Sequence, residues 1–151
     1  MQVYQFLVAY VGLGTVLPVV LHHKLHGVVS GLQIAMAFFL ALNILISFWE
    51  IGLGMHIKHI QKEYKRLQEK FKKDKFASVI EFFFMSVSVT EMLSLKYWSR
   101  VWSTYSLYDP SYANCESYGF FIDVGNGWST LLPSALFLVG MSIDIMPARW
   151  L

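Results

Sequence analysis

Residues 28–55 read VVSGLQIAMAFFLALNILISFWEIGLGM, and this run decides the class of fold. It has no charged side chain before Glu50 and exceeds the roughly 20 residues that a helix needs to cross the ~30 Å hydrocarbon core of a bilayer. A second uncharged run covers residues 1–21. Because 56% of the chain is hydrophobic and its mean hydropathy is +0.48, these runs predict an integral membrane protein.

Two segments nearer the C-terminus extend the same pattern. Residues 76–95 are apolar apart from Glu81 and Glu91, and an uncharged run follows Asp123 as far as Ile143. The sequence therefore predicts an all-α fold, a polytopic four-helix membrane bundle that forms a single domain over residues 1–151. The predicted crossings are residues 3–21, 28–55, 77–96 and 120–143.

Most of the positive charge lies in one predicted loop, residues 56–75. Its eight basic residues are Lys58, Lys62, Lys65, Arg66, Lys70, Lys72, Lys73 and Lys75. The positive-inside rule places this loop on the cytoplasmic side, or on the stromal or matrix side of an organelle, together with both termini. The aromatic loop 97–118 is then expected in the opposite compartment. The net charge of +2 thus indicates topology and contact with anionic lipid headgroups, and it does not indicate nucleic-acid binding.

Apolar side chains recur at helical spacing within this basic loop. They are Ile60, Tyr64, Leu67 and Phe71. This spacing predicts an amphipathic basic helix between the second and third crossings.

Polar side chains form one-sided stripes on two of the predicted crossings. The stripe on 28–55 consists of Asn43, Ser47 and Glu50, and the stripe on 120–143 consists of Asp123, Asn126 and Thr130. Glu50 and Glu81 lie toward the basic loop, where pairing with its lysines is expected.

Glu91 and Asp123 are the acids expected nearest the opposite face of the membrane. Charge at bilayer depth is costly and usually has a partner or a role. Two carboxylates that approach each other can share a proton, which raises one pKa and suits acid–base catalysis. Alternatively, Arg100 or Lys96 pairs with them and their role is structural.

Aromatic residues gather in and around segment 97–112. Trp and Tyr favour the membrane interface, so an interfacial belt is one interpretation and a stacking surface for a sterol or pigment is the other. The candidate ligand-binding residues are Trp98, Trp102, Tyr105, Asp109, Asn126 and Trp128.

Histidine and cysteine patterns do not predict a metal site. His22, His23 and His26 form an HHxxH cluster, but polar residues at an interface explain it. Cys115 is the single cysteine, which excludes an intramolecular disulfide and a cysteine metal site. No cofactor is therefore predicted apart from a bound lipid, sterol or pigment.

One motif suggests a family. Trp102-Ser-Thr-Tyr105-x3-Asp109-Pro110-x-Tyr112 follows an acid, Glu91, and precedes a helix with an early acid, Asp123, and a later proline, Pro133. Over about residues 78–143 the chain resembles the EXPERA domain, the family of emopamil-binding sterol isomerases and sigma-2-receptor-like proteins.

The resemblance implies that Glu91 and Asp123 are cavity acids, which hold the amine of a ligand or protonate a sterol double bond. It also implies that Asp109 orders the turn that follows Tyr105.

Two functional classes follow from the sequence. The first is a non-catalytic accessory subunit that packs against other integral membrane subunits and membrane lipids. The alternative is an EXPERA-type sterol or lipid isomerase, or a protein that binds a small hydrophobic ligand through intramembrane carboxylates. The sequence leaves open whether the protein is an enzyme.

Overall fold

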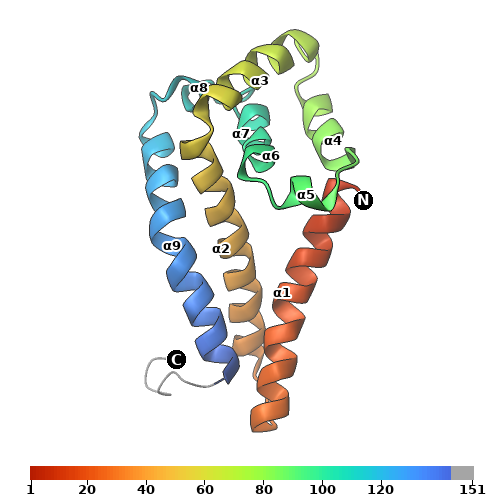
Figure 1. The fold of residues 1–151 in the computed structure, drawn as a ribbon, viewed down its shortest axis with the longest axis vertical. Helices are drawn as coiled ribbons and strands as arrows, with labels where there is room; N and C mark the ends of the chain where they lie inside the picture. The colour runs from red at the N-terminus through yellow and green to blue at the C-terminus, as the bar shows by residue number, and fades with distance from the viewer. Residues whose placement is uncertain (144–151) are drawn as a thin grey trace.

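The computed structural model describes residues 1–143, which fold into helices without a β-strand among them. Three long helices are α1 (Val3–His26), α2 (Gly31–Met55) and α9 (Tyr118–Ile143). The shorter helices gather at one end (Figure 1). They are α3 (Ile57–Lys70), α4 (Phe76–Phe84), α5 (Val89–Met92), α6 (Leu95–Trp98), α7 (Arg100–Tyr105) and α8 (Ser111–Asn114). Two helices of the described region, α1 and α2, are long and apolar enough to cross a membrane.

A tight turn joins α1 and α2 into an antiparallel pair. Gly27 ends α1 in the left-handed conformation, at φ 75°, and its N–H donates to the carbonyl of His23 at 2.8 Å. Ser30 then caps α2 in a reciprocal box with Gln33. Further along the pair, a Cβ atom on Gly14 would lie 3.0 Å from that of Ala41, so the helices approach closely there.

The prediction of one continuous crossing helix over 77–96 is wrong. Helix α4 ends at Phe84, and Met85 adopts an extended conformation with ψ 137°. Residues 85–88 run beside the start of the chain, where the Val3 N–H donates to the Met85 carbonyl at 3.1 Å and the Val87 N–H to the Met1 carbonyl at 2.9 Å. These bonds replace the hydrogen bonds of a continuous helix.

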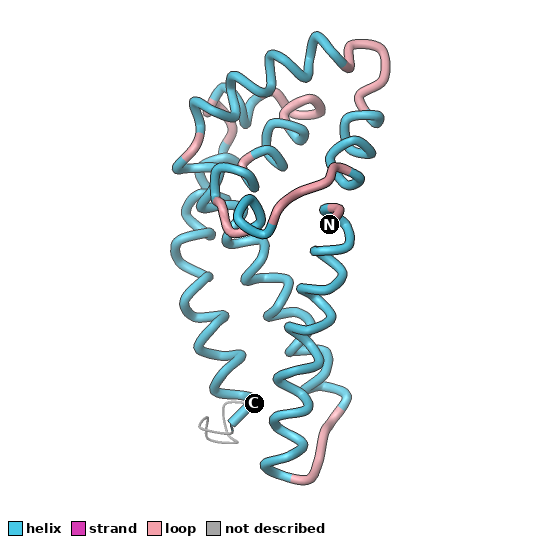
Figure 2. Tube along the Cα trace, turned by 45° about the vertical axis from the view of Figure 1, so that its right-hand side comes forward, coloured by secondary structure: helices cyan, strands magenta, loops and turns pink. Residues whose placement is uncertain are grey.

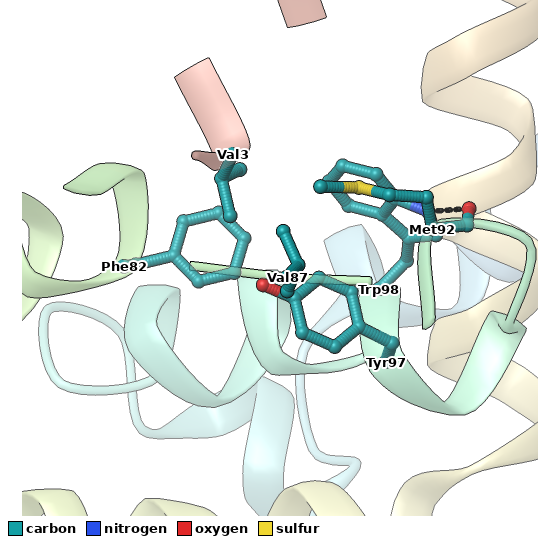
Figure 3. Close-up of a cluster of buried hydrophobic side chains, with 6 residues drawn as sticks. All are labelled: Val3, Phe82, Val87, Met92, Tyr97 and Trp98. Carbon is teal, nitrogen blue, oxygen red and sulfur yellow. Dashed lines mark hydrogen bonds between the residues drawn. The ribbon is translucent and has the colours of Figure 1, made fainter. Parts of the chain in front are cut away.

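An apolar core surrounds this extended segment. It is built from Val3, Phe82, Val87, Met92, Tyr97 and Trp98, which come from α1, α4, the extended segment, α5 and α6 (Figure 3). The Trp98 indole N–H donates to the Met92 carbonyl at 2.7 Å, which satisfies its polar atom inside the core. Three of the apolar residues expected in lipid, Phe82, Val87 and Met92, thus pack inside the protein.

The absence of that crossing changes the arrangement of the loops. Helix α3 and the aromatic segment lie at the same end of the molecule (Figure 2), and the Gln61 side-chain amide donates to the Ala113 carbonyl at 2.9 Å. The expectation that loop 97–118 lies opposite the basic loop is therefore wrong. Helix α9 runs from this end to the far end, beside the α1–α2 turn (Figure 1). The C-terminus, residues 144–151, lies outside the described residues.

Candidate carboxylate site between α2 and α9

The polar stripes of α2 and α9 face each other in an antiparallel seam. The Asn43 amide donates to Ser134 Oγ at 2.6 Å, and the hydroxyl oxygens of Ser47 and Thr130 lie 2.7 Å apart. The prediction that Asn43 and Ser47 share one face of their helix is confirmed. Their pairing with α9 is not predictable in the same way, because the sequence alone does not specify which helices are neighbours.

Glu50 is the next member of the seam, and it faces Gly127. A Cβ atom on Gly127 would lie only 2.7 Å from the backbone nitrogen of Ile51 and 2.8 Å from the Cβ of Glu50. The two helices therefore touch at this point. Glu50 is 7% exposed, and no residue of the described region forms a hydrogen bond or an ion pair with its carboxylate. The predicted pairing of Glu50 with a lysine is absent from these residues.

Asp123 lies one helical turn before Gly127, on the same face of α9. Because Gly127 touches Glu50, Asp123 lies about one helical turn along the seam from Glu50. The Tyr112 hydroxyl donates to Asp123 Oδ2 at 2.6 Å. Burial and this hydrogen bond raise the pKa of Tyr112, so the phenol stays a neutral donor.

An aromatic layer packs around Tyr112, the residue that binds Asp123. Tyr112 stacks on Trp102 with ring centroids 5.2 Å apart, and Tyr105 meets Tyr112 edge-on at 4.9 Å. The Trp102 indole N–H donates to the Trp49 carbonyl at 2.7 Å, which anchors the layer to α2. Two of the predicted ligand-binding residues, Trp102 and Tyr105, thus lie beside one of the predicted acids.

Glu91 does not belong to this group. It is exposed in α5, beside the start of α1, whereas α9 lies on the other side of α2 (Figure 1). Its carboxylate accepts the Ser88 backbone N–H at 2.9 Å and the Ser88 hydroxyl at 2.8 Å, and these bonds lower the pKa of Glu91. The prediction that Glu91 approaches Asp123 is wrong, because it assumes a continuous helix over 77–96.

The remaining predicted ligand-binding residues lie in the apolar core, in the turn at Asp109 or on the exposed surface of α9. Trp98 is 1% exposed and belongs to the apolar core. Asp109 accepts the backbone N–H of Ser111 at 3.1 Å and its hydroxyl at 2.6 Å, which orders the turn. Trp128 is 61% exposed, and Asn126 is an exposed residue of α9.

Arg100, one of the two cations considered as partners of these acids, has other neighbours. Arg100 lies 4.0 Å from Glu63 and donates to the sulfur of Met85 at 3.4 Å. Glu81 pairs with Lys70, so the prediction of a lysine partner is confirmed for that acid.

A second polar contact fastens the opposite end of the bundle. His22 Nδ1 lies 3.1 Å from the Met141 carbonyl, and its Nε2 lies 2.6 Å from the Gln33 amide nitrogen, so one imidazole joins α1, α2 and α9. A cavity of about 440 Å³ opens beside it, lined mainly by apolar side chains such as Met36 and Phe137. Within residues 1–143, no three His, Cys, Asp or Glu side chains gather as a metal site.

No family model matches the chain, and no curated protein or solved structure gives a significant match. The candidate site is therefore interpreted from its own residues.

Proposed function

We propose that the chain is a membrane protein that binds a hydrophobic cation at Glu50 and Asp123. The carboxylate of Glu50 carries this proposal, because the residue is only 7% exposed, lies in an apolar helix and has no partner for its charge among the described residues. An ionised group in such a place costs several kcal/mol unless a proton or a cation compensates its charge. A ligand amine supplies that charge, and its apolar body suits the surrounding lipid.

Asp123 and the aromatic layer complete the proposed site. The Tyr112 hydroxyl fixes the orientation of Asp123, and the neighbouring rings offer flat apolar faces and cation–π contacts. The resemblance to the EXPERA domain implies that Glu91 is a cavity acid. In this proposal Glu50 is that cavity acid instead. The catalytic alternative uses the same site: the protein would be a sterol or lipid isomerase in which Glu50 donates the proton and Asp123 stabilises the cation.

In this proposal α1, α2 and α9 cross the membrane. Helix α9 spans about 39 Å at 1.5 Å per residue, which is long enough for a tilted crossing. It also exposes apolar side chains along its length, namely Phe121, Ile122, Trp128, Leu132, Leu136 and Val139. The hydrocarbon of the bilayer is the solvent that suits this surface.

The proposal is tested by the binding of N,N-dimethyldodecylamine to the purified protein, with 1-dodecanol as the uncharged control ligand. Glu50→Gln is expected to weaken amine binding by about tenfold or more, because a charge-assisted contact of about 1.5–3 kcal/mol is lost. Asp123→Asn is expected to weaken it as well. Glu91→Gln is the matched control and is expected to bind like the wild type. Unchanged amine binding by Glu50→Gln would contradict the proposal.

A role as an accessory subunit is the second candidate. Gly12 lies on α1, in a helix whose exposed side chains are mostly apolar, and a Cβ atom added to it would have no neighbour within 4 Å. Such small residues let another helix approach closely. Gly27, in contrast, is required by the end of α1. Gly12→Leu is expected to abolish co-migration with a larger complex on a native gel, and unaltered co-migration would count against this role.

A further inference from the structure

The segment that replaces the predicted third crossing leaves an apolar edge exposed. On α4, Phe76, Ile80 and Phe84 recur every four residues, and Leu93, the residue after α5, lies four residues beyond Val89 at the start of that helix. We call these five residues the α4–α5 edge. Phe84, Val89 and Leu93 are 55%, 69% and 75% exposed. Glu91 lies about half a helical turn from both Val89 and Leu93, so the polar and apolar sides of α5 are separate.

The height of the α4–α5 edge along the bundle is fixed by the start of α1. Residues 85–88, which join α4 to α5, bond to the first three residues through the Met85 and Val87 backbone, and Gln2 pairs with Ser86. On α1 itself, Tyr4 and Val8 continue the exposed apolar surface along a helix apolar enough to cross a membrane. The edge therefore lies where α1 would enter the bilayer.

Positive charge lies at one end of the α4–α5 edge, beside Phe76. Lys72, Lys73 and Lys75 are exposed in the turn that joins α3 to α4. Of the nearby acids, Glu81 pairs with Lys70, and Asp74 accepts the backbone N–H groups of Phe76 and Ala77 at the start of α4. The turn thus carries an excess of positive charge directly after the basic helix α3, which complements anionic headgroups.

We propose that the α4–α5 edge lies in the headgroup region of one leaflet of an anionic bilayer. Phe84, Val89 and Leu93 insert below the headgroups, and the three lysines of the turn contact lipid phosphates. This proposal rests on the crossing of α1 but not on the ligand site. The backbone of residues 85–88 is partly satisfied by the start of the chain, which suits a shallow position better than the depth of the hydrocarbon.

The position of the edge is measured with an environment-sensitive fluorophore on single cysteines in the Cys115→Ser background. The labelled sites are Val89→Cys and Leu93→Cys, with Val16→Cys on α1 as the lipid-facing control and Glu69→Cys as the water-facing control. The full chain is reconstituted in phosphatidylcholine vesicles, with and without phosphatidylglycerol. Quenchers are aqueous iodide and a lipid that carries a nitroxide just below its headgroup.

Labels at both edge positions are expected to shift to the blue and to lose fluorescence to the nitroxide lipid, unlike the label at Glu69→Cys. Exposure of both edge labels to iodide, with the Val16→Cys label still in lipid, would overturn the proposal and leave the crossing of α1 intact. A Val16→Cys label in water would overturn both. Edge labels shielded from both quenchers would mean that a protein covers the edge, which also overturns it.

The role of charge is tested by replacing the three lysines together. Lys72→Gln, Lys73→Gln and Lys75→Gln are expected to remove the extra nitroxide quenching that phosphatidylglycerol gives in the parent chain. Lys58→Gln, Lys62→Gln and Lys65→Gln on α3 are the matched control and should preserve it. Equal nitroxide quenching of the parent chain in vesicles with and without phosphatidylglycerol would refute the contact with anionic lipid.

Discussion

Gly127 determines how closely α9 approaches Glu50. The nearest atoms to its missing Cβ are two backbone atoms of α2 and the Cβ of Glu50, which cannot move aside as the end of a flexible side chain can. Gly125 lies two residues away on the same helix and has nothing within 4 Å of its own Cβ position. The two glycines thus differ in packing while sharing a helix.

Gly127→Ala is expected to lower the stability of the folded protein by about 1–3 kcal/mol, because the added methyl group overlaps the α2 backbone. Gly125→Ala is expected to be neutral or to stabilise the helix by up to about 1 kcal/mol. Thermal unfolding in a mild detergent compares the two variants. Equal midpoints would mean that α9 is not in contact with α2 at Gly127.

Glu91 stabilises the start of α5, the helix to which it belongs. Because its pKa is lowered, the stabilisation that its ionised form gives is present above the ordinary pKa of a glutamate, and it is lost as the pH falls through the lowered value. Glu91→Ala is expected to speed hydrogen exchange at the Ser88 amide and within α5, without an effect on amine binding. Weaker amine binding by Glu91→Ala would instead restore the role that the sequence assigns to it.

Among the elements, the two helices with long uncharged runs, α1 and α2, are predictable from the sequence, and so is α9. The segment over 77–96 is not, because its apolar content resembles that of a helix. A local signal is present, since Ser86, Val87, Ser88, Val89 and Thr90 alternate small polar with β-branched residues, a pattern with the period of an extended chain. The extended conformation is stabilised by hydrogen bonds to the backbone of residues 1–3, and a local sequence pattern does not reveal these distant partners.

The candidate site is likewise predictable from the sequence only in part. Asp123 and the turn at Asp109 can be found from their motif, which is local. From the sequence, Glu50 is expected to pair with a lysine of the basic loop. Its neighbour in the structure is Gly127, which lies more than 70 positions later in the chain, so the sequence does not reveal this contact. The predicted position of Glu91 depends on the register of a helix that does not form. Contacts between distant elements therefore account for both errors.

His22 is the side chain that joins the three long helices at the end opposite α3. His22→Leu removes its hydrogen bonds to α2 and α9, and it is expected to lower the free energy of unfolding by about 1–3 kcal/mol. His23→Leu is the control, because His23 is exposed on the same turn. Chemical unfolding in detergent measures both. A similar loss in the two variants would show that His22 does not fasten the bundle.

At the scale of the whole molecule, the described residues form three long helices with the shorter helices α3–α8 at one end, in place of the predicted four-helix bundle. With α1, α2 and α9 as the proposed crossings, Lys65 and Tyr108 lie on one side of the membrane and Val28 on the other. A membrane-impermeant thiol reagent on sealed vesicles is therefore expected to label Lys65→Cys and Tyr108→Cys together, in the Cys115→Ser background, and to label Val28→Cys from the opposite side. Labelling of Tyr108→Cys together with Val28→Cys would favour four crossings.

The seam between α2 and α9 repeats its polar pairs at successive helical turns, and Gly127 distinguishes one alignment of the two helices from the next. A slide of α9 by one turn, about 5.4 Å, would place Asn43 opposite Thr130, Ser47 opposite Asn126 and Glu50 opposite Asp123. The Asp123 Cβ would then stand where a Cβ on Gly127 would lie 2.7 Å from the Ile51 backbone nitrogen, so the contact at Gly127 excludes that alignment. A disulfide between Ser47→Cys and Thr130→Cys is therefore expected to form, and one between Ser47→Cys and Asn126→Cys is not.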